Sequence, residues 1–153
     1  MPSQNRIQLY TWISKETDVN SIIIEASAEN YAPVYAHRHN IMPSLVVYEM
    51  LGYENDKVKR YVAIINEIYS ENPITPSSMN YLLSLRCDIY IVTWSEDLKA
   101  RPYLDKKLES YQPLFKEVYE NPSGKIYFLN RTAATLIEKP AHGETNALDK
   151  PPS

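Results

Sequence analysis

The sequence predicts an α/β fold, specifically a three-layer sandwich with a small, mostly parallel sheet and a C-terminal antiparallel hairpin. Three observations lead to this prediction. The run from Asp88 to Trp94 is apolar without alternation, which is typical of an interior strand in a parallel sheet. Apolar residues at helical spacing occur before and after this strand. The segment Asn121-Pro-Ser-Gly124 is suited to a type I turn between two strands.

Length and composition indicate one folded domain. The chain has 153 residues, 44% of them hydrophobic and 23% charged, which is ordinary for a globular protein. Residues 1–131 are predicted to form a single α/β domain. Residues 132–153 are predicted to be a C-terminal extension, disordered because prolines and polar residues replace any periodicity. A net charge of -3 gives no electrostatic reason to expect nucleic acid as a partner.

Cysteine content and hydropathy limit the class further. The single cysteine, Cys87, excludes an internal disulfide and is expected to be a buried, inert thiol. The longest apolar runs, Ile22-Ile23-Ile24 and Leu45-Val46-Val47, fall far short of the ~20 residues that span a bilayer. The first residues lack the hydrophobic core of a signal peptide. The chain as given is therefore expected to be soluble.

The N-terminal third is predicted to form a helix and two strands. Residues 4–17 carry Ile7, Tyr10 and Ile13 at helical spacing, and Ser3 is placed to cap the helix. Ser21–Ala26 is rich in β-branched residues and is predicted to be a strand covered on both faces. Residues 31–37 are a candidate second strand, which Pro33 would confine to its first residue or to a sheet edge.

The middle of the chain is predicted to be helical. Residues 40–51 are predicted as a short helix ended by Gly52. Val58 to Tyr69 contains the clearest helical stripe, made of Val58, Tyr61, Val62, Ile65, Ile68 and Tyr69. Thr75 followed by Pro76 is a start signal for the next helix, because the hydroxyl caps and proline suits the first position.

After the buried strand, the sequence predicts a loop, a helix and the hairpin. Residues 95–101 are polar and are predicted to be a loop. A helix is expected from about Pro102, with Leu104, Leu108 and Tyr111 on one side. Residues 113–130 are predicted to form the closing hairpin.

The candidate ligand-binding residues are Trp94, Glu96, Asp97 and Arg38. The first three follow the buried strand, and ligands of parallel sheets bind beyond the carboxyl ends of the strands. Helix capping by Ser95 or Asp97 would explain the same residues without a ligand. The Arg38 guanidinium is suited to phosphate or carboxylate.

No catalytic residue, metal or cofactor is predicted. His37 and His39 would lie on one face of an extended segment, about 7 Å apart, but no third ligand has a supporting spacing. The three glycines are isolated, so no dinucleotide or phosphate loop exists, and there is no Gly-x-Ser-x-Gly elbow. The thirteen tyrosines favour semi-buried packing over a base- or sugar-stacking platform.

Three segments together resemble a known family. They are Tyr10-Thr-Trp-Ile-Ser-Lys-Glu-Thr-Asp-Val-Asn-Ser-Ile-Ile-Ile24, Tyr81-Leu-Leu-Ser-Leu-Arg-Cys-Asp-Ile-Tyr-Ile-Val92 and the hairpin Phe115–Phe128. Their order resembles the soluble C-terminal extracytoplasmic domain of multi-pass GT-C type membrane glycosyltransferases, which are polyprenyl- or dolichyl-phosphate-sugar mannosyltransferase-like proteins. Residues 17–19 lack the family's usual proline, and Arg86-Cys87 replaces its usual glycine.

The resemblance implies a non-catalytic accessory domain on the extracytoplasmic face of a membrane. The family's catalytic carboxylates belong to loops near its first membrane helices, and this chain has no such loop. Its partners would be the membrane domain of a parent protein and a lipid-linked sugar or glycan acceptor, and the resemblance strengthens the case for Arg38. The alternative is a freestanding cytosolic α/β ligand-binding module or small enzyme of unknown substrate.

Overall fold

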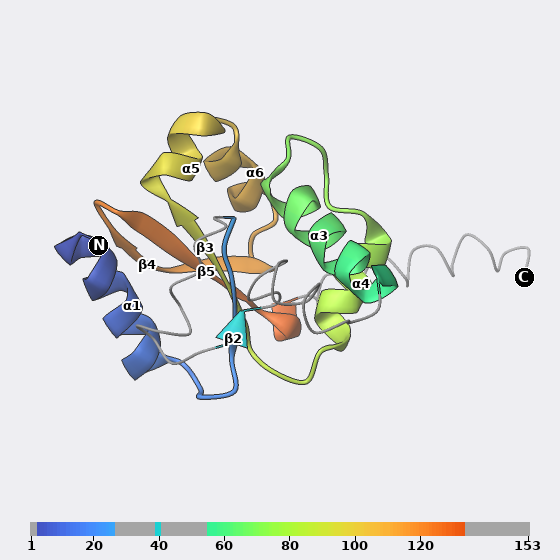
Figure 1. Cartoon of the computed structure of the whole chain (residues 1–153), viewed down its shortest axis with the longest axis horizontal. Coiled ribbons are helices and arrows are strands. Elements are labelled where there is room, and N and C mark those ends of the chain that lie inside the picture. The colour runs from blue at the N-terminus through green and yellow to red at the C-terminus, as the bar shows by residue number, and fades with distance from the viewer. Residues whose placement is uncertain (1–2, 27–38, 41–54, 134–153) are drawn as a thin grey trace, which may run out of the picture.

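The structure, a computed structural model, describes residues 3–26, 39–40 and 55–133. The described part of the chain contains, in order, α1 (Gln4–Glu16), β1 (Ile22–Ile24), β2 (His39–Asn40), α3 (Asn55–Tyr69), α4 (Pro76–Ser84), β3 (Ile89–Trp94), α5 (Ser95–Ala100), α6 (Leu104–Ser110), β4 (Phe115–Asn121) and β5 (Gly124–Leu129) (Figure 1). Within these ranges, no helix combines the length and the apolar composition needed to cross a bilayer.

The five strands form one mixed sheet in the order β2-β1-β3-β5-β4. Strand β1 pairs in parallel with β2 and β3, whereas β5 pairs antiparallel with β3 and β4. Only β5 therefore opposes the common strand direction. Strand β3 is central, and all six of its residues are buried. The predicted α/β class, mostly parallel sheet, buried central strand and closing hairpin are confirmed.

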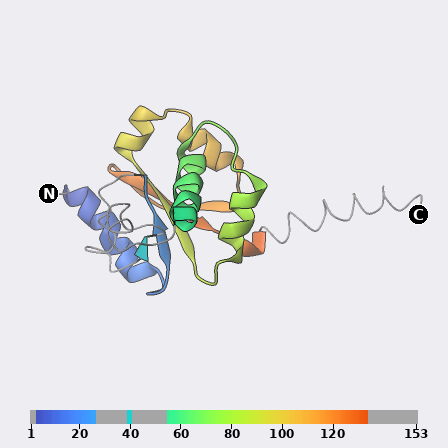
Figure 2. The same cartoon turned by 45° about the vertical axis from the view of Figure 1, so that its right-hand side comes forward.

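Helices cover the sheet on both faces, which gives three layers (Figures 1 and 2). Alternation along β3 directs Tyr90, Val92 and Trp94 into a cluster with α1, and directs Ile89 and Ile91 into a cluster with α3, α4 and α6. Both clusters are apolar, so β3 is buried from two sides. This arrangement explains why its sequence does not alternate.

Two helix starts follow the capping predictions. The Ser3 Oγ accepts a hydrogen bond from the Arg6 backbone N–H at 3.3 Å. At α4, Thr75 Oγ1 accepts from the Ser78 backbone N–H at 3.2 Å, with Pro76 in the first turn. In each case a hydroxyl satisfies one of the N–H groups that a helix start leaves open.

On α1 and α3, some of the apolar residues predicted to face the sheet are not the buried ones. On α1, Ile7 is 38% exposed, whereas Leu9 is fully buried beside Tyr10 and Ile13. On α3, Ile64 is buried while Val62 is only half-buried. Apolar residues flank the buried positions on both helices, so the sequence alone does not decide which of them faces the sheet.

Residues 95–101 were predicted as a loop, and this prediction is wrong because Ser95–Ala100 form helix α5. The Asp97 carboxylate lies in the first turn and its Oδ2 accepts from the Trp94 backbone N–H at 2.9 Å. Acidic residues in the first turn also complement the helix dipole. The capping alternative for these residues thus holds for Asp97.

Cys87, which precedes β3, is half-buried rather than fully buried. Burial raises the pKa of its thiol, although the Arg131 guanidinium opposes the shift. A raised pKa lowers the thiolate fraction, in agreement with an inert thiol.

Three predictions fall wholly or mostly outside the described residues. These are the strand at 31–37, the helix at 40–51, of which only Asn40 is described and lies in β2, and the C-terminal extension beyond Ala133. Ala133 itself is buried, with 4% of its surface exposed.

Gly124 allows a close approach of β5 to β3, and its replacement should destabilise the fold. A Cβ at Gly124 would lie 2.6 Å from the Thr93 carbonyl oxygen and 3.2 Å from the Trp94 Cα. We expect Gly124→Ala to lower the free energy of unfolding by about 1–3 kcal/mol in urea denaturation, as overpacking does. Ser123→Ala, in the same turn, removes only a 3.3 Å hydroxyl contact with Ser3. It should change the free energy of unfolding by less than about 0.5 kcal/mol. Equal effects would contradict the steric explanation.

Candidate functional site

The carboxyl ends of β1 and β3 bring polar side chains from distant parts of the chain together. Because these strands pair in parallel, with Ile24 opposite Ile91, both end at the same edge of the sheet. Glu25 follows β1 directly, and Asp97 lies three residues after β3. This is the edge at which the sequence predicted a ligand site.

Tyr69, the last residue of α3, links the two strands at this edge. Its buried hydroxyl lies 2.6 Å from the Val92 carbonyl oxygen and 3.1 Å from the Ile24 carbonyl oxygen, and it donates to both. Burial raises the pKa of Tyr69 well above its ordinary value, the Asp97 and Glu25 carboxylates raise it further, and Arg101 opposes them. Tyr69 is therefore a neutral donor held between two strands.

Glu25 is a buried carboxylate, only 4% exposed, that the sequence reasoning missed. Its Oε1 accepts from the Tyr10 hydroxyl at 2.7 Å and from the Trp94 indole N–H at 3.1 Å. The two donor rings also contact each other, with centroids 5.3 Å apart. A signal for Glu25 existed, because an acid directly after three isoleucines stands at a strand's carboxyl end, as Glu96 and Asp97 do.

The predicted residues Trp94, Glu96 and Asp97 come together at this edge, but intramolecular partners engage each of them. Trp94 is 1% exposed, and the Arg6 guanidinium lies 4.1 Å from its ring centroid. Glu96 is exposed and forms an ion pair with Arg6 at 2.9 Å. Asp97 is buried and accepts from the Trp94 backbone. These contacts organise the edge and leave the Trp94 ring covered.

The other predicted residues are not tested. Arg38 and His37 lie outside the described residues, and the side chain of His39 is not described. Within the described ranges, no group of three or more histidine, cysteine, aspartate or glutamate side chains could hold a metal ion.

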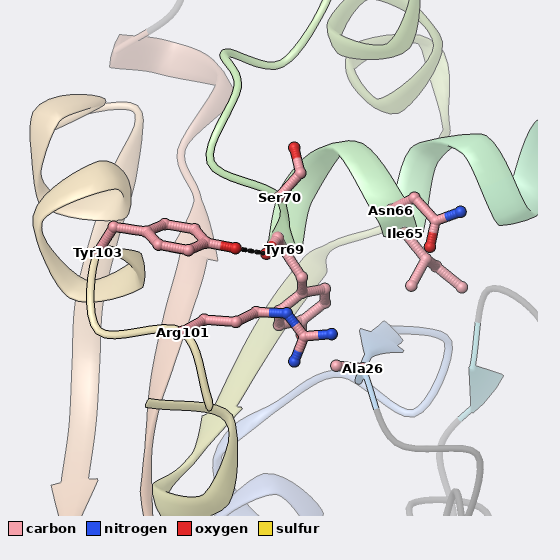
Figure 3. A pocket seen from close by; sticks show the side chains of 7 residues that line it. All are labelled: Ala26, Ile65, Asn66, Tyr69, Ser70, Arg101 and Tyr103. Carbon is pink, nitrogen blue, oxygen red and sulfur yellow. Dashed lines mark hydrogen bonds between the residues drawn. The ribbon is translucent and has the colours of Figure 1, made fainter. Parts of the chain in front are cut away.

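Beside the linked strand ends lies a cavity of about 300 Å³ (Figure 3). It is formed by the second residue after β1, by the end of α3 and by the segment between α5 and α6. The lining residues are Ala26, Ile65, Asn66, Tyr69, Ser70, Arg101 and Tyr103. The Tyr103 hydroxyl donates to the Tyr69 carbonyl oxygen at 2.8 Å, which fixes one wall to α3 (Figure 3).

Arg101 supplies the positive charge of this cavity. Its side chain is 40% exposed, and its Nη1 lies 4.0 Å from Asp97 Oδ1, the outer limit of an ion pair. In the close-up the guanidinium extends past Tyr103 toward Tyr69 and Ala26 (Figure 3). Within the described ranges this is the guanidinium's only carboxylate neighbour, so it retains N–H donors for an anion.

Comparison of the chain with protein-family models, with curated proteins and with solved structures finds no match.

Removing the Glu25 acceptor should destabilise the domain. Glu25→Leu would leave the Tyr10 hydroxyl and the Trp94 N–H without this shared acceptor. We expect a loss of about 2 kcal/mol or more in urea unfolding, because an orphaned buried donor costs roughly 1–3 kcal/mol. Glu25→Gln retains a side-chain carbonyl and should lose less. Equal losses for the two variants would show that hydrogen bonding to this oxygen is unimportant.

Burial of Asp97 should make stability depend on pH. Burial raises the carboxyl pKa above its ordinary value of 3.8, opposed by the Trp94 N–H and by Arg101. A pKa raised by folding means that the folded state binds the proton more tightly, so stability falls as pH rises through the folded pKa. Asp97→Asn removes this titration and can still accept from the Trp94 N–H.

We therefore expect the free energy of unfolding of Asp97→Asn, relative to the wild type, to increase between about pH 4 and pH 7. Glu109→Gln replaces an exposed carboxylate and is the matched control for the loss of one negative charge. A constant or decreasing difference for Asp97→Asn would contradict the assigned direction. Urea unfolding at several pH values provides the measurement.

Proposed function

We propose that this chain is a non-catalytic ligand-binding domain whose cavity holds the phosphate or carboxylate group of a small molecule. The observation that carries this proposal is the placement of Arg101 in a cavity at the carboxyl edge of β1 and β3. Guanidinium forms paired, charge-assisted hydrogen bonds with such anions. Asn66 and Ser70, which also line the cavity, carry groups that can add hydrogen bonds.

The chemistry of the neighbouring groups supports binding rather than catalysis. The Tyr69 hydroxyl donates to main-chain carbonyls, and the Asp97 carboxylate accepts from the main chain. A general acid or base must reach a substrate proton. These two groups face the protein's own backbone instead, while the half-buried Arg101 still borders the cavity and has room for a ligand.

We further propose that the domain is an accessory part of a membrane glycosyltransferase on the extracytoplasmic side. The support is the resemblance of its three segments, which run through α1 and β1, through α4 and β3, and through the hairpin of β4 and β5. In that setting the ligand is a lipid-linked sugar phosphate or a glycan acceptor, and the partner is the membrane domain. The alternative remains a freestanding cytosolic α/β binding module or small enzyme.

The ligand chemistry is common to both settings, and the surrounding gene separates them. A series of hydrophobic spans encoded in frame before residue 1 would support the glycosyltransferase setting. An authentic start codon with a ribosome site there would support the freestanding protein.

Phosphate binding tests the cavity directly. We expect inorganic phosphate to shift the backbone amide NMR signals of residues that line the cavity, with saturation in a titration. Arg101→Gln should weaken binding about ten-fold or more, because hydrogen bonds to charged groups contribute roughly 1.5–3 kcal/mol. Lys99→Gln removes an exposed cation two residues away and should leave affinity unchanged. Absence of saturable shifts, or equal effects of the two variants, would overturn the proposal.

A further inference from the structure

The segment Asn130-Arg-Thr132 is the only match in the sequence to asparagine, any residue except proline, then serine or threonine. This pattern marks asparagines that carry a glycan on the side-chain amide nitrogen. Asn121-Pro-Ser123 comes close, but the proline in its middle position excludes it. A pattern of three residues also arises by chance, so the structure around Asn130 has to distinguish the two explanations.

Asn130 directly follows β5, and the chain around it is fixed at two points. Its backbone N–H donates to the Leu114 carbonyl oxygen at 2.8 Å. The guanidinium of the next residue, Arg131, donates to carbonyl oxygens at the end of α4, among them that of Leu85 at 2.7 Å. Asn130 itself is half-buried, and Thr132 is exposed. The segment therefore lies at the surface, with its middle residue anchored to the protein.

The side-chain amide of Asn130 has its oxygen engaged and its nitrogen available. Oδ1 accepts from the Ala133 backbone N–H at 3.4 Å, whereas Nδ2 has no hydrogen-bond partner within the described ranges. Asn121 differs, because its Nδ2 donates to the Asn5 carbonyl oxygen in α1 at 2.8 Å. A glycan on Nδ2 of Asn130 leaves Oδ1 and its hydrogen bond in place. The folded domain therefore accommodates a glycan at Asn130 without the loss of these contacts.

Asn130 lies at the end of the sheet opposite to the Arg101 cavity. Strand β5 runs antiparallel to β3, with Phe128 opposite Tyr90. The end of β5 is therefore beside the start of β3, whereas the cavity lies beside the carboxyl ends of β1 and β3. A glycan at Asn130 would leave the cavity open to a ligand.

We infer that Asn130 is the attachment site of an N-linked glycan. A separate transferase would join Nδ2 to C1 of a sugar that is carried on a lipid pyrophosphate. The C1–N bond forms, the C1–O bond to the phosphate breaks, the lipid pyrophosphate leaves, and the amide nitrogen gives up one proton. Of the proposed function only the extracytoplasmic setting is needed here, because the chain is itself modified and binds no ligand in this step.

Secretion of the 153-residue chain from cultured animal cells, behind a cleavable signal peptide, tests this site. We expect intact-mass spectrometry to show one glycan per chain, both in the medium and in cell extracts. Peptide N-glycosidase should remove the glycan and convert the modified asparagine to aspartate, which peptide mapping should place at position 130. Asn130→Gln and Thr132→Val should abolish the glycan, because each removes a side chain that the pattern requires. Thr132→Ser retains the hydroxyl and should keep the glycan.

A chain without glycan in both fractions would overturn the inference, and so would a glycan that persists in Asn130→Gln. Equal loss in Thr132→Ser and Thr132→Val would also contradict it. Thr132 is exposed, and urea unfolding of its variants will verify that the fold is retained. Phosphate titration of the same samples separates this inference from the proposed function. Phosphate binding by an unglycosylated chain would overturn only the glycan site, and a glycosylated chain that binds no phosphate would overturn only the Arg101 site.

Discussion

The arrangement of this domain depends most on the hydrogen bonds that the Tyr69 hydroxyl donates to strands β1 and β3. This hydroxyl is buried beyond the last isoleucine of β1 and beside the end of β3, where it donates to one carbonyl oxygen of each strand. Carbonyl groups buried at a strand end need a donor, since an unsatisfied one is costly. The hydroxyl supplies that donor and thereby fixes the C-terminal end of α3 against the sheet.

The position of α3 in turn determines the Arg101 cavity. The carbonyl oxygen of Tyr69 accepts from Tyr103, so the segment before α6 is held against the end of α3 (Figure 3). The Lys107 ammonium adds a second connection between α6 and the carbonyl oxygen of Ser70. A wall built from such fixed contacts keeps its shape before a ligand arrives, which reduces the entropic cost of binding.

The charged groups at the carboxyl edge differ in burial, and therefore in what they contribute to the domain. The Arg6–Glu96 pair lies on the surface, where solvent screens it, and an exposed pair of this kind contributes little to stability. Glu25 is buried, so its hydrogen bonds with Tyr10 and Trp94 are specific constraints on α1, β1 and β3. Arg101 differs from both, because it is half-buried beside Asp97 and still reaches the cavity.

The sequence by itself determined the features that depend on neighbouring residues. The caps at Ser3 and Thr75, the uninterrupted apolar strand β3 and the hairpin of β4 and β5 were all predicted, because local hydrogen bonding and hydropathy specify them. It also indicated the sheet edge beside which the Arg101 cavity lies. Only the tertiary structure decided that Ile7 stays exposed, that Glu25 is buried and that Arg101 shares a cavity with Tyr69 and Tyr103. Those outcomes depend on which helix face meets the sheet and on contacts between distant residues, which no local pattern encodes.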